Sequence, residues 1–169
     1  SFSIINFYER RARRILPALF TVLIFTTFFA WHLLPPIEFK DYGQSLFSVS
    51  LFASNIFFWL ESGYFDLGID LKPLIHTWSL GVEEQFYILF PLLILLIYTV
   101  YKRFVFPVIF ILFFLSLFFS HSYSAPESEI FSREAAFFLL PTRAWELLLG
   151  SILFLTYNNN FIISNKWLN

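Results

Sequence analysis

An uncharged apolar window at residues 16–34 is the feature that most constrains what this chain can fold into. Its length of about 19 residues is close to the ~20 that an α-helix needs to cross the hydrocarbon core of a bilayer. Four further windows approach this length: residues 44–60, 82–101, 104–120 and 144–157. The last is the weakest, because Pro141 would kink or restart its helix. The pattern predicts an all-α fold, a polytopic transmembrane helix bundle with about five spans.

The composition supports a membrane protein and excludes thiol chemistry. Hydrophobic residues make up 58% of the chain and charged residues 14%, whereas charged residues are typically about 25% of a soluble domain. Without cysteine, these residues can form neither a disulfide framework, nor a thiol nucleophile, nor a cysteine metal site. The formal net charge is only -1, so an anionic partner is indicated solely by local clustering, and we expect no nucleic-acid partner.

Such a cluster lies just before the first apolar window. Arg10, Arg13 and Arg14 follow the i, i+3, i+4 spacing of one helical face, and Arg11 is turned about 100° away. Four guanidinium groups beside a membrane can hold a polyphosphate through bidentate hydrogen bonds. They can equally anchor the helix to anionic lipid head groups. The residues alone leave both interpretations open.

The positive-inside rule gives this cluster a predicted side of the membrane. If it is cytoplasmic, five spans place seven basic residues inside: Arg10, Arg11, Arg13, Arg14, Lys72, Arg133 and Arg143. The four outside are Lys40, Lys102, Arg103 and Lys166. The excess favours this orientation mildly, because residues 102–103 form a basic pair on the outer side.

Two carboxylates, Glu83 and Glu84, stand at the start of the apolar window at 82–101. A charge at membrane depth costs ~2.5–3.5 kcal/mol on insertion scales and therefore usually marks a site. If a helix begins near Trp78, Glu83 and Tyr87 are i, i+4 neighbours, and His76 lies about two turns before Glu83. This face could act as a proton relay, with His76 and Glu83 as supporting catalytic candidates. Trp78, Glu84 and Tyr87 are further candidates. We expect Glu83→Gln to cause a large loss of activity and Glu84→Gln a milder one, because Glu84 points to another side of the helix.

A purely structural interpretation of the same segment stays open. Thr77 or Ser79 would cap the helix, and the two acids would lie favourably at its positive N-terminal end. A metal site is a poor alternative, because His32 and His121 lie in other segments and no paired ligand spacing occurs. We therefore predict no bound metal.

Two other polar features have simple structural interpretations. Arg143 and Glu146 are i, i+3 neighbours that predict an intrahelical ion pair at a membrane boundary, and both are retained as site candidates. Asn55 lies in an apolar window and is expected to bond across to a neighbouring helix.

Three stretches, in this order, together resemble one known family. They are FYERRARRILPAL at residues 7–19, HTWSLGVEEQFYILFPLLI at 76–94 and PTRAWELLLG at 141–150. This arrangement is similar to the acyltransferase-3 family, membrane enzymes that O-acylate bacterial surface glycans. The resemblance implies transfer of an acyl group, most often acetyl, from coenzyme A to a hydroxyl of a polysaccharide, lipopolysaccharide or lipid-linked sugar. It also implies a multi-pass protein of the bacterial inner membrane.

The resemblance implies roles for several residues as well. Arginines of this motif are implicated in acyl-coenzyme A handling, which makes Arg10, Arg11, Arg13 and Arg14 the candidate donor-binding residues. Acyl-coenzyme A would be a donor substrate, with no tightly bound cofactor, and Arg143 and Glu146 would help to shape the donor path. The other partners would be membrane lipid and the glycan acceptor.

The family's membrane domain has about ten helices, so residues 1–169 resemble a partial domain, a middle section without the first and last helices. The family's essential histidine would precede Ser1, and we expect the isolated chain to insert in a membrane without transferring acetyl groups. Two competing classes remain: a transporter or proton path built on the intramembrane acids, and a catalytically inert membrane scaffold.

Overall fold

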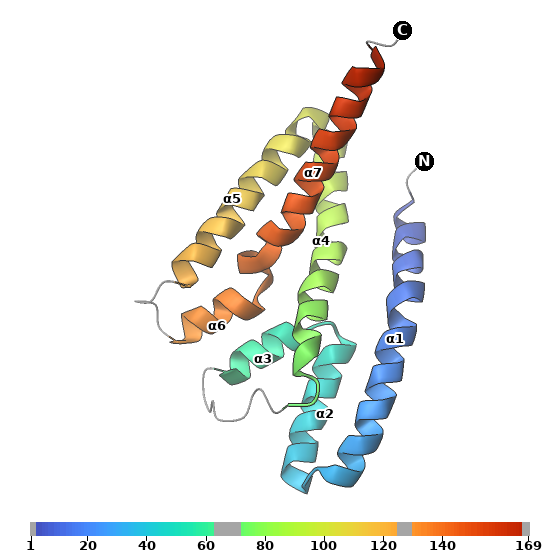
Figure 1. Ribbon diagram of the computed structural model, residues 1–169, viewed down its shortest axis with the longest axis vertical. Coiled ribbons are helices and arrows are strands. Elements are labelled where there is room, and N and C mark those ends of the chain that lie inside the picture. The colour runs from blue at the N-terminus through green and yellow to red at the C-terminus, as the bar shows by residue number, and fades with distance from the viewer. Residues whose placement is uncertain (1–2, 63–71, 125–129, 167–169) are drawn as a thin grey trace.

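The computed structural model describes residues 3–62, 72–124 and 130–166, and its elements in these ranges are helices (Figure 1). The longer ones are α1 (Ile4–Leu33), α2 (Pro36–Ser50), α4 (Trp78–Val100), α5 (Val105–Tyr123) and α7 (Leu140–Lys166). The shorter ones are α3 (Ser54–Ser62), η2 (Ile75–Thr77), η3 (Lys102–Phe104) and α6 (Ile130–Phe138). The predicted all-α class is confirmed.

Four helical stretches are long and apolar enough to cross a membrane: Ile4–Leu33, Ile75–Val100, Val105–Tyr123 and Arg133–Tyr157. Most residues in these windows are not buried; the buried share is 22% at its highest. In a chain this apolar, such surface is suited to contact lipid or further helices. Four of the five predicted windows therefore lie in helices of spanning length.

The remaining window, residues 44–60, does not form a single membrane-spanning helix. Its chain leaves the helix after Ser50, and Phe52 adopts a φ of 53°, a left-handed conformation that is strained for a bulky residue. The 15 residues of α2 rise about 22 Å, which is short of the ~30 Å hydrocarbon core. The next residues turn into α3, which runs in a different direction (Figure 1).

This break also overturns the predicted topology. The predicted topology places Lys40 and Arg103 on the same, outer side of the membrane. In the structure Lys40 lies near the turn between α1 and α2, and Arg103 lies in the turn between α4 and α5. Figure 1 shows these two turns at opposite ends of the molecule. The physical reason is that α2 returns only part of the way along α1, so the chain turns back into α4 well short of the opposite end of the molecule (Figure 1).

Pro141 acts as predicted: α6 ends at Phe138, and α7 restarts at Leu140 with the proline in its first turn, where a missing N–H is tolerated. The hydroxyl of Thr142 donates to the carbonyl oxygens of Ala135, at 3.0 Å, and Leu139, at 2.8 Å. The side chain therefore links the last turn of α6 to the start of α7 across the break.

Two apolar clusters hold the helices together. The first joins α1, α2, α3, η2 and α6 through Leu19, Leu23, Ala30, Tyr42, Val49, Phe58, Leu74 and Phe138. The second joins α4, α5 and α7 through Phe86, Ile109 and Leu148. The α1–α2 pair is also tied by polar groups, because the Tyr42 hydroxyl lies 3.0 Å from that of Thr26 and 2.8 Å from that of Thr27.

Candidate functional site

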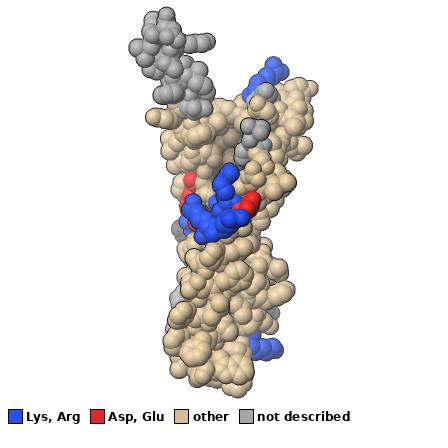
Figure 2. Space-filling model, turned by 90° about the vertical axis from the view of Figure 1, so that its right-hand side faces the viewer, with Lys and Arg blue, Asp and Glu red and all other residues tan. Residues whose placement is uncertain are grey.

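Three of the four clustered arginines share an exposed face of α1. The side chains of Arg10, Arg13 and Arg14 are exposed, and Arg11 is half-buried, as the helical spacing predicts. Arg13 pairs with Glu9 on the same helix at 2.8 Å, in an exposed geometry that contributes little stability. Arg10 and Arg14 form no ion pair within the described residues. Figure 2 shows basic groups gathered midway along the long axis, with largely uncharged surface on either side.

Arg11 points the other way and binds Glu84 of α4. Its Nε donates to both carboxylate oxygens, at 2.9 Å and 3.2 Å, and its Nη2 donates to Oε1 at 2.6 Å. The side chains of Arg11 and Glu84 are only 16% and 9% exposed. Charge-assisted, two-pronged bonds of this kind are the strong ones, especially where water is scarce.

Two tyrosines complete this contact between α1 and α4. The guanidinium carbon of Arg11 lies 3.2 Å from the ring centroid of Tyr87, so the ring covers one face of the cation. The hydroxyl of Tyr8 donates to the carbonyl of Ile88 at 2.9 Å. Arginine, carboxylate and aromatic ring therefore form one site between the two helices.

The proton-relay face expected on His76 and Glu83 is not assembled. Helix α4 does begin at Trp78, as predicted, but His76 and Glu83 are both exposed and share no hydrogen bond within the described residues. Thr77 precedes the helix without capping it, since its hydroxyl donates back to the carbonyl of Leu74 at 2.7 Å. Of the two carboxylates, the structure buries Glu84 and leaves Glu83 at the surface.

The opposite side of α4 brings together two other candidates from distant parts of the sequence. The guanidinium of Arg143 lies 5.0 Å from the ring centroid of Trp78, and that ring packs at a tilt against Phe137, with 4.4 Å between the ring centroids. Arg143 also forms the predicted ion pair with Glu146 at 2.6 Å. This cluster connects the start of α4 to α6 and α7, away from the arginines of α1.

A largely buried pair of amide side chains joins two of the helix breaks. Asn55 of α3 and Gln85 of α4 exchange hydrogen bonds, at 2.8 Å and 3.3 Å. Asn55 also donates to the carbonyl of Phe138 at 3.1 Å, and Gln85 donates to that of Phe52 at 3.0 Å. Both carbonyls lie at helix breaks, where the backbone lacks its helical partners and no lipid group can replace them. The predicted cross-helix bond of Asn55 is confirmed.

Gly81 explains why α3 and α4 approach so closely at this point. A Cβ added to Gly81 would lie 2.8 Å from Oδ1 of Asn55 and 3.1 Å from Oγ of Ser54. The hydroxyl of Ser54 in turn donates to the carbonyl of Thr77 at 2.9 Å. Sequence reasoning missed Gln85 and Gly81, although a second amide in an apolar helix was the same signal that identified Asn55.

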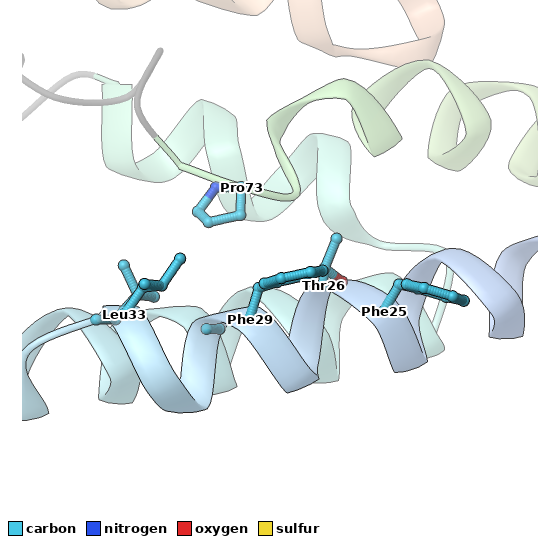
Figure 3. A pocket seen from close by; sticks show the side chains of 7 residues that line it. Phe25, Thr26, Phe29, Leu33 and Pro73 are labelled. Atoms are coloured by element: carbon cyan, nitrogen blue, oxygen red, sulfur yellow. The ribbon is translucent and has the colours of Figure 1, made fainter.

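A separate pocket at the far end of α1 has no charged lining. Figure 3 shows Phe25, Phe29 and Leu33 on one side of it and Pro73 on the other. Its volume is about 220 Å³. Thr26 is its one polar lining residue, and no charged side chain lines it, so the pocket is not part of the charged site. Among the residues that the structure describes, no three His, Asp or Glu side chains are grouped so as to hold a metal ion.

Fold and site together define a helical membrane protein with a buried ion pair and an exposed basic face between apolar ends. The family described as an acyltransferase domain matches residues 1–168, so the chain belongs to the acyltransferase-3 family of membrane O-acyltransferases. No solved structure matches the chain significantly.

Known relatives agree with this membership. An uncharacterized protein of Haemophilus influenzae is 35% identical over 168 residues, which cover 98% of this chain and 67% of that protein. The O-acetyltransferase OatA of Staphylococcus aureus is 32% identical over 158 residues, 89% of this chain. A putative O-acetyltransferase of the same species is 31% identical over 153 residues. The chain spans only 24% of the length of each of these two staphylococcal proteins.

Proposed function

We propose that the protein containing this chain transfers an acyl group, most simply acetyl, from coenzyme A to a hydroxyl of a bacterial surface glycan or lipid-linked sugar. Family membership and the relatives named O-acetyltransferases support this reaction class. Lipopolysaccharide and other envelope polysaccharides both supply hydroxyls of the required kind. The protein would act in the bacterial inner membrane, where donor and acceptor can approach from opposite faces.

The observation that carries the proposal is the exposed arginine face of α1. Arg10 and Arg14 have no ion-pair partner within the described residues, and Arg13 is held only by an exposed intrahelical pair. Exposed guanidiniums on adjacent turns suit the clustered phosphates of coenzyme A, because each can give two parallel hydrogen bonds to phosphate oxygens. An acyl-coenzyme A would then be bound as a substrate and not as a resident cofactor.

In this reaction the acceptor oxygen attacks the thioester carbonyl carbon, the carbon–sulfur bond breaks, and the acceptor proton passes by way of a base to the departing thiolate. A well-placed base would contribute ~10²–10⁴-fold to the rate. His76 is exposed just before α4 and remains a supporting candidate, although it forms no ion pair with a carboxylate of the described residues.

A proton path fits the structure less well. Its intramembrane carboxylate must exchange protons with a neighbouring group or water, whereas Glu84 is 9% exposed and both its carboxylate oxygens are bonded to Arg11. The acyltransferase and the proton path also differ in the residues that they need. A proton path requires the carboxylate but not the exposed arginines, whereas the proposed acyltransferase requires the arginines to bind its donor.

Replacing both Arg10 and Arg14 by Gln should raise the KM for acetyl-coenzyme A at least ~10-fold, since two charge-assisted contacts to phosphate are lost. The measurement is transfer of radiolabelled acetyl to envelope glycan by the full-length protein in membrane vesicles. Arg103→Gln is the matched control, because Arg103 is exposed at the far end of α4 and should leave KM unchanged. Wild-type vesicles that transfer no acetyl would contradict the proposed function.

A further inference from the structure

Arg11 differs from its three neighbours in what its guanidinium already binds. Two of its five N–H donors point to Glu84, and Tyr87 covers one face of the cation. Its side chain is 16% exposed, whereas that of Arg13 is 79% exposed. Little of Arg11 is therefore free to meet a phosphate.

The Arg11–Glu84 pair is also one of few links between α1 and α4, whose backbones rarely approach each other. The second link is the hydrogen bond from Tyr8 to the carbonyl of Ile88. Tyr8 lies three residues before Arg11, and Ile88 lies four residues after Glu84, so the two links are about one turn apart on each antiparallel helix. Two contacts at this spacing fix both the position of α1 along α4 and the rotation of α1 about its own axis.

Building on the proposed function, we propose that Arg11 and Glu84 are positioning residues. Their ion pair holds α1 on α4 and turns the opposite face of α1, with the exposed arginines, toward the acyl donor. Arg11 acts through this pair and not as a ligand of the donor. Glu84 serves the site by holding the arginine helix and not by moving a proton.

Removing one member or both members of the pair separates these roles. A single neutral replacement leaves a charge with little access to water, and such a charge disrupts packing far more than replacement of the whole pair by apolar side chains of similar length. A positioning pair therefore predicts that the double replacement rescues the single ones. If Arg11 were a donor ligand, the double replacement would remain as defective as Arg11→Met, because the guanidinium is absent from both.

The experiment compares Arg11→Met, Glu84→Met and the double replacement in the full-length protein. Donor KM and kcat are measured with radiolabelled acetyl-coenzyme A in membrane vesicles. Helix placement is measured separately, through cross-linking of Tyr8→Cys and Ile88→Cys by a bifunctional thiol reagent. The chain has no cysteine of its own, and any cysteine outside it would be replaced by Ser. Glu38→Gln, an exposed glutamate on α2, is the control.

We expect each single replacement to lower kcat/KM at least ~10-fold and to reduce cross-linking, and the double replacement to regain most of both. The donor KM of the double replacement should lie within ~3-fold of the wild-type value. A double replacement that cross-links normally but keeps the raised KM of Arg11→Met would overturn the inference and make Arg11 a ligand. Single replacements with normal cross-linking would also overturn it. If wild-type protein transfers no acetyl while cross-linking follows the expected pattern, the proposed function is wrong, but the role of the Arg11–Glu84 pair in holding α1 on α4 is supported.

Discussion

Glu84→Gln is expected to lower the free energy of unfolding by about 3 kcal/mol, and Glu83→Gln to change it by less than about 1 kcal/mol. Glu84 is 9% exposed and neutralises Arg11, whose charge would remain in a poorly hydrated site. Glu83 is exposed and makes no ion pair within the described residues. Thermal unfolding of the two variants in the same detergent measures the difference, and equal melting temperatures would contradict this order.

The sequence predicted the larger effect, a loss of activity, at Glu83, whereas the structure buries Glu84 and leaves Glu83 exposed. Helical spacing places Glu83 and Glu84 about 100° apart, but it does not say which of the two faces meets α1. That depends on how α1 packs, and the packing is decided by contacts between segments some 73 positions apart, such as Arg11 and Glu84. The sequence could predict that an acid here matters, but not which one.

Asn55→Leu is expected to lower the free energy of unfolding by about 2–4 kcal/mol, which is more than the roughly 0.6 kcal/mol of an average hydrogen bond between membrane helices. The larger value follows because the change leaves the amide oxygen of Gln85 and the carbonyl of Phe138 without the N–H donor that Asn55 supplies. The measurement is thermal unfolding, supported by the amount of protein that inserts in membranes.

Ser50→Ala provides the control for Asn55→Leu. Among the described residues its hydroxyl bonds only to the carbonyl of Leu46 in the same helix, and its side chain is exposed, so its loss should be nearly neutral. If Asn55→Leu were as stable as Ser50→Ala, the amide pair could not be what holds the helix breaks together.

Local signals predicted much of the fold. Apolar length identified four stretches that form helices of spanning length, Pro141 marked the restart of α7, and the i, i+3 spacing gave the ion pair of Arg143 with Glu146. The break at Phe52 carries no such signal, because neither Gly nor Pro occurs there and the strained residue is stabilised by Gln85 from another helix. The topology failed for the same reason, since it depended on residues 44–60 crossing the membrane.

The candidate site shows the same division between local and long-range information. The exposed face formed by Arg10, Arg13 and Arg14 followed from helical periodicity alone. The separation of Arg11 from that face was also predicted, but its partner was not. The contact between Trp78 and Arg143 could not be predicted, because it requires knowing that α6 folds back onto the start of α4.

Direct binding of coenzyme A to the purified full-length protein tests the central claim, that the exposed arginine face of α1 holds the acyl donor. The comparison is between wild type, the Arg10→Gln, Arg13→Gln, Arg14→Gln triple variant, and the Arg103→Gln control, all at one fixed salt concentration. We predict that the triple variant binds at least ~10-fold more weakly and that the control matches wild type. Equal affinity of the triple variant and wild type would contradict the account.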